Sequence, residues 1–270
     1  MAFKTIMVQL DVDSIAAPRI SMAWDLAQRH DADLIGFCAA EPHFVIPTGT
    51  DDQAAIWSQM EEIEGHLDCL REQFLSTVNG SNRAAWRGEI GNPTGQLALN
   101  ARAADLIITG SPSIDLVVDH HRTLDTASLI LAAGRPILVA SGTCAPIKAE
   151  TILIAWNDTR EARRAVVDAR PFLIAARDVV IATMDNGDTT AENVADVELF
   201  LTRHGVKARS EVLNARHSEP AELLLRIGQE IEADLVVLGG YGHSRVWEMT
   251  FGGVTRSVLR SGWLHRFISN

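Results

Sequence analysis

The chain has 270 residues, 47% of them hydrophobic, and a formal net charge of −11 at pH 7. This acidic balance argues against a nucleic-acid surface, because neutralising phosphates requires clustered lysine and arginine. No apolar run approaches the ~20 residues that span a bilayer, and the N-terminal residues enter a strand pattern without signal-peptide features. We therefore expect a globular protein with no nucleic-acid partner and no membrane partner.

Cysteine usage points to a reducing compartment. Cys38, Cys69 and Cys144 are widely spaced and form no CxxC pair. A sparse and odd set of this kind fits buried thiols rather than a disulfide framework. The sequence therefore predicts a cytoplasmic protein.

The first half alternates short apolar runs with helical patterns. A helix is predicted near 15–29, and Asn92 and Pro93 look like the N-cap and first residue of a later helix. Strands are predicted near 4–10, 33–39, 84–90, 104–109 and 136–140.

A long helix is predicted between the second and third of these strands. Its apolar residues recur every three or four positions, at Ile56, Met60, Ile63, Leu67, Leu70, Phe74 and Val78. Such spacing is typical of a helix with one apolar stripe against a sheet. A coiled coil is the alternative, but three heptads are few and no partner helix is evident.

The second half repeats the alternation. Ser218 is a candidate N-cap, with Pro220 tolerated in the first turn of the helix that follows. Strands are predicted near 151–156, 178–183, 207–213 and 233–238, and helices near 159–175, 190–203, 219–231 and 253–260.

The two halves resemble each other as whole domains. The run 5–11 is similar to 151–157, and 104–110 is similar to 233–239. The polar stretch 141–148 contains glycine and proline and separates the copies, which gives domains at 1–147 and 148–270. Since strands and helices alternate in both, we expect an α/β fold with parallel sheets and helices on both faces.

A glycine-rich loop follows the last predicted strand of the second copy. It reads Gly239-x2-Gly242-x9-Gly252-Gly253, between the apolar run 233–238 and the helical pattern 254–260. Glycines at the end of a strand let the backbone approach a ligand closely, and a helix N-terminus behind them suits a phosphate. The alternative is a glycine-rich connection that binds nothing.

With these features the chain resembles a tandem universal stress protein. The loop is similar to that family's G-x2-G-x9-G-[ST] motif, and the strand ending at Asn157 resembles the family's first strand, which normally ends in an Asp. The resemblance implies two Rossmann-like, five-stranded parallel sheets of order 3-2-1-4-5. It also implies ATP, with or without Mg²⁺, at the carboxyl ends of strands 1 and 4.

The resemblance also assigns roles to residues. Gly239 and Gly242 would let the loop pass beside the ribose and phosphates, and Gly252 and Gly253 would present N–H groups to the β- and γ-phosphates. Asn157 stands where the family has the Asp that contacts adenine or ribose. His243 could touch a phosphate or simply cover the loop.

Two features depart from the family pattern. The Ser or Thr after the third glycine is Gly253 here, and Thr255 or Ser257 could supply the missing hydroxyl. The segment 261–270 predicts only a short, irregular fifth strand. Because tandem copies in the family often pair through their fifth strands, the irregular segment leaves that pairing open on this side.

The first copy departs further. Asp11 stands at the family's Asp position, but the loop beginning Gly110-Ser111-Pro112 has lost its later glycines. Pro112 also removes an N–H donor. We expect that this copy does not bind ATP in the usual way and serves as a partner surface for the second copy. The result would be an intramolecular pseudo-dimer, with a homodimer left open.

Neither catalytic nor metal-binding motifs stand out. Asp119, His120 and His121, with Glu41 and His43, invite a metal site, but they lack metal-ligand spacing, and polar loop residues are the better explanation. The sequence thus predicts a stress sensor or regulator that binds ATP in its second domain and acts on an unknown regulatory protein. The alternatives are a nucleotide-independent interaction module and a slow ATP hydrolase.

Overall fold

The structure is a computed structural model that describes residues 2–43, 50–111, 119–184, 191–213, 219–241 and 252–270. The chain forms two compact units, Ala2–Arg135 and Pro136–Asn270. The division falls just before the last strand predicted for the first copy, so that strand belongs by its contacts to the second unit. Among the described helices, none is long and apolar enough to cross a membrane.

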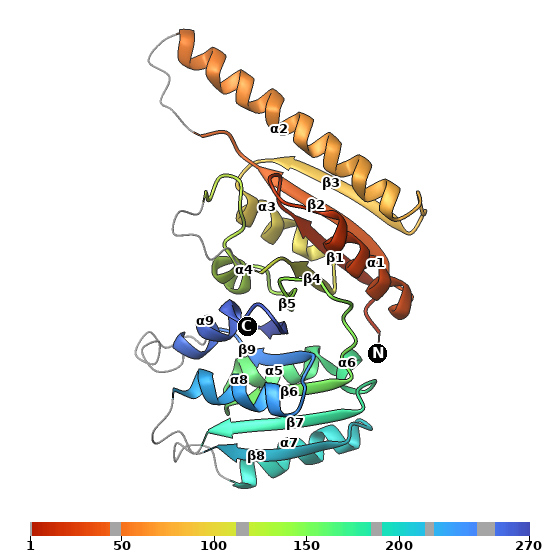
Figure 1. Cartoon of the computed structure of the whole chain (residues 1–270), viewed down its shortest axis with the longest axis vertical. Helices are drawn as coiled ribbons and strands as arrows, with labels where there is room; N and C mark the ends of the chain where they lie inside the picture. Colours follow the sequence, from red (N-terminus) through yellow and green to blue (C-terminus); the bar gives the residue numbers. More distant parts are fainter. Residues whose placement is uncertain (1, 44–49, 112–118, 185–190, 214–218, 242–251) are drawn as a thin grey trace. The chain divides into compact units, whose positions relative to one another are not determined.

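The first unit contains a parallel sheet of order β3-β2-β1-β4, with its helices labelled in Figure 1. The strands are β1 (Thr5–Leu10), β2 (Asp33–Ala40), β3 (Ala84–Ile90) and β4 (Leu106–Thr109). The helices are α1 (Ala17–His30), α2 (Thr50–Thr77), α3 (Pro93–Asn100) and α4 (Thr126–Ala132), with a 3₁₀ turn at Ala101–Ala103.

The second unit has the strand order β5-β10-β9-β6-β7-β8. Every pairing in it is parallel except that of β5 with β10. The strands are β5 (Ile137–Val139), β6 (Thr151–Trp156), β7 (Asp178–Met184), β8 (Ala208–Leu213), β9 (Leu235–Gly239) and β10 (His265–Ser269). The second copy therefore has the expected order 3-2-1-4-5.

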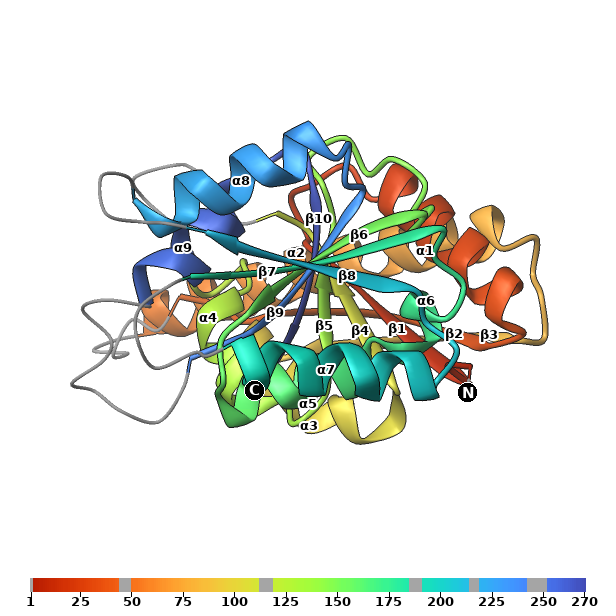
Figure 2. The same ribbon diagram turned by 90° about the horizontal axis from the view of Figure 1, so that it is seen from below.

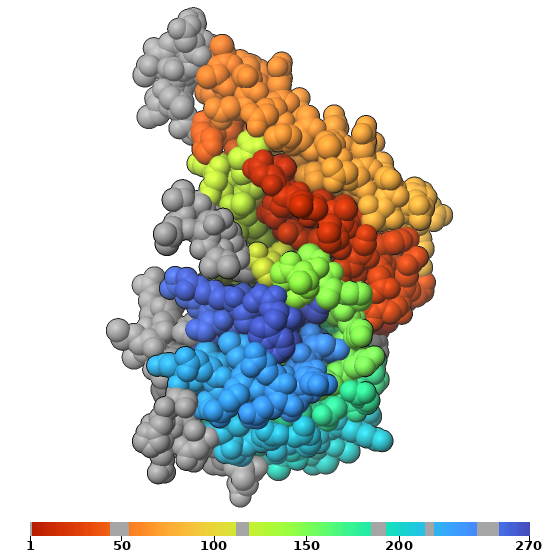
Figure 3. All heavy atoms as spheres, in the orientation of Figure 1, coloured from red at the N-terminus to blue at the C-terminus, as the bar shows by residue number. Residues whose placement is uncertain are grey.

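Helices cover both faces of this second sheet. Figure 2 shows α5 and α7 on one face and α8 on the other, and α8 contacts α9, which lies beside it in Figure 3. The helices are α5 (Arg160–Asp168), α6 (Arg170–Leu173), α7 (Ala191–Arg203), α8 (Pro220–Glu230) and α9 (Gly252–Arg260). The α/β class predicted from the alternating pattern is confirmed.

The long helix α2 packs on the sheet rather than forming a coiled coil. Its buried residues are Ile63, Leu67, Leu70 and Phe74, and it contacts β2 and β3. The Phe74 ring lies 5.7 Å from the ring of Trp86 on β3. The stripe of apolar residues read from the sequence is therefore the surface that covers the sheet.

Helix boundaries follow local chemistry, with two differences from expectation. The Asn92 side chain accepts the Gly95 N–H at 3.0 Å, which confirms that cap. The N-cap of α8 is Glu219 rather than Ser218, and it places Pro220 at the first helical position, where proline is preferred. The helix predicted over 159–175 is divided into α5 and α6, because Pro171 has no N–H to continue the ladder.

The internal duplication is visible in matching hydrogen bonds. Asp105 accepts the N–H groups of Lys4 and Thr5 at 2.8 and 3.0 Å. Asp234 accepts those of Glu150 and Thr151 at 2.9 and 3.3 Å. In each copy, the aspartate before the fourth strand thus caps the first strand, at positions that the sequence repeat relates.

The segment 261–270 contradicts the expectation of an irregular strand. β10 is a regular strand in which all five residues are buried, and it pairs with β9 on one side and antiparallel with β5 on the other. The fifth strands of the two sequence copies therefore do pair. The buried polar side chains of β10 find hydrogen-bond partners, as burial requires. Arg266 donates to the Leu264 carbonyl at 2.7 Å, and the Ser269 hydroxyl donates to Asp168 at 2.9 Å.

The β10 histidine predicts a pH dependence of stability. Burial, with a smaller effect from the Arg266 charge, lowers the pKa of His265 from 6.5 to about 4. Its neutral Nδ1 accepts the Ser141 N–H at 3.1 Å. In the unfolded chain this histidine binds a proton near pH 6.5, whereas in the folded protein it does so only near pH 4. The free energy of unfolding is therefore highest above pH 6.5 and falls by about 3 kcal/mol as the pH is lowered to 4.

The measurement is urea denaturation of wild type and His265→Asn between pH 4 and 7. Asparagine can accept the same N–H but does not titrate. We expect a smaller loss in the variant, while the carboxylates titrate equally in both proteins. If the free energies of unfolding of the two proteins fell equally between pH 7 and pH 4, His265 would not be a buried neutral histidine.

Candidate functional site

The strand order of the second unit reverses between β6 and β9. From β6 the chain proceeds outward to β7 and β8, and from β9 it proceeds to β10 on the other side. Ligands of open α/β sheets bind at the carboxyl ends of the strands at such a reversal. The residues at this edge are Asn157, which follows β6, and Gly239, which ends β9.

Gly239 lies directly against the first turn of α5. A Cβ atom at this position would be 2.5 Å from the Ala162 nitrogen and 2.7 Å from the Glu161 carbonyl carbon. Both are backbone atoms, so a side chain would force the helix away from the sheet. Glycine is required here by close backbone approach, and the approach places the N-terminus of α5 beside the end of β9.

Asn157 is held by the N-cap of the same helix. The Thr159 hydroxyl donates to Asn157 Oδ1 at 3.1 Å and accepts the Ala162 N–H at 3.2 Å. Asn157 Nδ2 makes no hydrogen bond to any residue in the described ranges, and the residue is half-buried. A primary amide of this kind carries two N–H donors.

Gly252, Gly253 and Thr255 lie in the first turn of α9. Gly252 and Gly253 are its first two residues, and the first N–H groups of a helix have no acceptor within the helix. Thr255 follows in the same turn and is buried, whereas Ser257 is exposed. Gly242 and His243 fall in the part of the chain that the structure does not describe.

A cavity that the sequence did not predict opens between α5 and α7. It has a volume of about 400 Å³, and its lining includes Trp156, Val166, Val197 and Phe200. The Asp158 carboxylate at its rim contacts Arg163 at 3.5 Å and Asn193 at 3.3 Å. No sequence motif signals such a cavity, because it depends on how two helices pack.

The corresponding edge of the first unit is occupied by Arg19. This buried guanidinium donates to the Gln9 carbonyl at 2.8 Å and to the Asp11 carboxylate at 3.2 Å. It also covers Gly110, where a Cβ atom would collide with it. The side chain at the family's Asp position is therefore already paired, and the space above the first glycine is filled.

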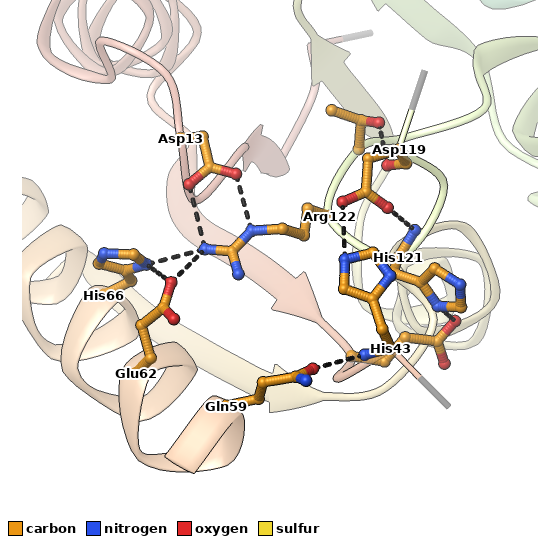
Figure 4. A network of polar contacts seen from close by, with 10 residues as sticks. Asp13, His43, Gln59, Glu62, His66, Asp119, His121 and Arg122 are labelled. Atoms are coloured by element: carbon orange, nitrogen blue, oxygen red, sulfur yellow. Dashed lines mark hydrogen bonds and ion pairs between the residues drawn. The ribbon is translucent and has the colours of Figure 1, made fainter. Parts of the chain in front are cut away.

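A second arginine holds the neighbouring segment 119–123. Arg122 binds Asp13 through two nitrogens, at 2.8 and 3.1 Å, and Glu62 of α2 at 3.2 Å (Figure 4). Its Nη2 lies 3.1 Å from His66 Nδ1. The hydrogen bond from Arg122 to the Asp13 carboxylate raises the pKa of the Arg122 guanidinium, which keeps the arginine charged.

Four of the five polar residues singled out as metal candidates pair with each other. His43 Nε2 lies 3.3 Å from Asp119, and His121 Nδ1 lies 3.0 Å from Glu41 (Figure 4). Within the described ranges, no group of three or more histidine, cysteine, aspartate or glutamate side chains is arranged to hold a metal ion. Arg19 and Arg122 were not predicted, since each reads in the sequence as an ordinary surface cation.

Comparison with known proteins identifies the second half. Residues 150–263, which contain the strand reversal and the glycine loop, match the model of the universal stress protein family. The chain carries a universal stress protein domain. No curated protein sequence matches the chain.

Solved structures extend the likeness over the whole chain. A universal stress protein from Archaeoglobus fulgidus DSM 4304 aligns with 98% of this chain and 96% of its own, at 13% identity and a TM-score of 0.75. A functionally unknown protein from Pseudomonas aeruginosa PAO1 aligns with 99% and 92%, at 17% identity and a TM-score of 0.61. At these identities the likeness shows the tandem universal stress protein fold.

A third structure, of a universal stress protein in complex with cAMP, aligns with 52% of this chain and 98% of its own. Its identity is 22% and its TM-score is 0.35.

The Arg19 contacts predict a stability effect in the first unit. Arg19→Met keeps the volume but removes the bonds to Gln9 and Asp11, and it leaves the carboxylate without its cation. We expect a loss of about 2–3 kcal/mol in urea denaturation, with partial recovery in the double variant Arg19→Met/Asp11→Asn.

The control is Arg29→Met, which removes the exposed pair with Asp25. Exposed pairs contribute little, so no loss beyond about 0.5 kcal/mol is expected. Equal effects of Arg19→Met and Arg29→Met would contradict the role given to Arg19.

Proposed function

We propose that the universal stress protein domain binds ATP, with or without Mg²⁺, and acts as a sensor or regulator rather than as an enzyme. The observation that carries this proposal is the glycine loop beginning at Gly239, at the edge where the strand order reverses. The contact of Gly239 with α5 brings the N-terminus of that helix to the same edge.

Asn157 supports the adenine or ribose end of the site. Its Nδ2 donors have no acceptor among the described residues, and its position after β6 matches the Asp of the family motif. An amide in place of a carboxylate also removes a negative charge that would repel a triphosphate. The neutral residue is therefore compatible with a nucleotide.

The start of α9 supports the phosphate end. α9 runs from the loop after β9 back to the amino end of β10, so its N-terminus lies at the same edge as the carboxyl ends of the strands. Unpaired N–H groups and the positive end of the helix dipole favour an anion there. Gly252 and Gly253 supply two of these N–H groups.

In the first unit we propose that no nucleotide binds in this way. Arg19 could attract a phosphate, but its contacts with the Gln9 carbonyl and Asp11 commit it internally. Its position over Gly110 fills the space that a ribose would need. This unit would instead serve as a partner surface, for the second copy or for a further protein.

A cytoplasmic location belongs to the same proposal. All three cysteines are free, with Cys38 buried, Cys69 exposed and Cys144 between these classes. Free thiols of this kind persist in a reducing compartment. Burial raises the pKa of the Cys38 thiol to about 12, so it stays protonated and unreactive.

The proposal predicts saturable binding of one ATP per chain in isothermal titration calorimetry with Mg²⁺. Gly242→Val should abolish it by placing a branched side chain in the phosphate path. Asn157→Ala should weaken it about 5- to 10-fold through the loss of one hydrogen bond. Gly65→Ala, at an exposed helical position with open space around it, is the control and should bind like wild type.

If millimolar ATP produced neither a heat of binding nor a change in the melting temperature, the proposal would be wrong. The nucleotide-independent interaction module would then be favoured. Full affinity in Gly242→Val would place the site elsewhere. Phosphate release above background in wild type, but not in a Gly239/Gly242 double variant, would favour the slow hydrolase.

A further inference from the structure

The cavity between α5 and α7 has mostly apolar walls. They are formed by Val166 and Val167 of α5, by Val197 and Phe200 of α7, and by Trp156 at the end of β6. The two helices cover the same face of the sheet (Figure 2). The volume of about 400 Å³ lies within the range of small-molecule sites. The cavity is therefore large enough for a small organic molecule.

The part of α7 that lines this cavity carries polar side chains as well as apolar ones. Asn193, Val197 and Phe200 follow one another at intervals of four and three residues, and all three line the cavity. Side chains at these intervals share one side of a helix. Asp196 also lines the cavity and precedes Phe200 by four residues, one helical turn. One face of α7 thus presents an apolar wall with a carboxylate beside it.

The cavity extends from a partly exposed side chain to a buried aromatic one. Val167 is 39% exposed, whereas Trp156 is 5% exposed. Aromatic ring faces carry partial negative charge and attract cations. With Trp156 and Phe200 both in the lining, an apolar ligand that carries a positive charge gains more here than a neutral ligand of the same shape.

The charges of the lining residues also favour a cation. The Asp158 carboxylate lies 3.5 Å from the Arg163 guanidinium and accepts an N–H of Asn193 at 3.3 Å, so the charges of Asp158 and Arg163 offset each other. Asp196 is exposed, and its carboxylate forms no ion pair with any residue that the structure describes. One negative charge therefore remains uncompensated in the lining, and it would repel an anion.

We propose that this cavity binds an aralkylamine, that is, a protonated primary amine joined to an aromatic ring by a short alkyl chain. The ammonium group would pair with Asp196 beside the Phe200 ring, and the ring of the ligand would pack against Trp156. The site is distinct from the proposed nucleotide site, because its lining includes neither Asn157 nor Gly239. It does not depend on the binding of ATP.

The test uses three probes that share a phenyl ring and a three-carbon chain and differ in charge: 3-phenylpropylamine, 3-phenylpropanol and 3-phenylpropanoate. Each is titrated at pH 7, without nucleotide, into the ¹⁵N-labelled full chain. The readout is the Nε1–H resonance of Trp156, which is identified by its loss in Trp156→Phe. This donor has no hydrogen-bond partner among the described residues, so no internal bond dominates its chemical shift.

Three variants accompany the probes. Asp196→Asn removes the charge but keeps the size of the side chain. Glu198→Gln is its matched control, because it removes a carboxylate from the same helix at a position outside the lining. Val197→Phe fills the cavity and should abolish binding of the amine and of the alcohol. Thermal unfolding checks that each variant remains folded.

We expect the amine to bind about 5-fold more tightly than the alcohol, and the propanoate to cause no saturable shift. In Asp196→Asn the affinities for amine and alcohol should agree within about 2-fold, since the ion pair is lost. Glu198→Gln should bind all three probes like wild type.

The proposal would be wrong if the amine caused no saturable shift of the Trp156 resonance, or if the alcohol or the propanoate bound as tightly as the amine. Equal weakening of the amine in Asp196→Asn and Glu198→Gln would also overturn it, as would wild-type affinity in folded Val197→Phe. Because Asp196 and its substitution lie at an exposed position, the comparison with Glu198→Gln decides the question even if Val197→Phe does not fold.

Discussion

The close approach of α5 to the end of β9 is the constraint on which the second unit depends. With no Cβ at Gly239, the backbone of Glu161 and Ala162 can lie against the strand. The same turn carries the Thr159 cap that orients Asn157. One missing side chain therefore places a strand end, a helix N-terminus and a polar amide at the edge where the strand order reverses, which is where ligands of such sheets bind.

In the first unit a different group covers the glycine at the end of the fourth strand. Its glycine at the end of the fourth strand, Gly110, is covered by the Arg19 guanidinium rather than by helix backbone. Arg19 then neutralises Asp11, and Arg122 neutralises Asp13 nearby. Both carboxylates of this edge are therefore already paired with an arginine. These pairs are the reason why we propose nucleotide binding for the second copy only.

The sequence was sufficient for the order of elements, since buried parallel strands and amphipathic helices leave strong local patterns. It failed where tertiary partners decide the outcome. His265, Arg266 and Ser269 look like a poor strand, yet each is hydrogen-bonded when buried, so β10 is regular. The role of Arg19 could not be predicted for the same reason, because it depends on tertiary contacts with Gln9, Asp11 and Gly110. Gly239, Gly252 and Gly253 could be singled out because glycine carries its own conformational signal.

The central claim is that the edge formed by β6, β9 and α9 receives a nucleotide. The most direct measurement is a titration of the ¹⁵N-labelled protein with Mg²⁺-ATP, followed by the backbone and side-chain amide resonances. We predict saturable shifts at Asn157, at 239–241 and at 252–255, with the resonances of Asp11 and Gly110 unchanged. Shifts confined to the first unit, or resonances at the second edge that do not move at saturating nucleotide, would contradict it.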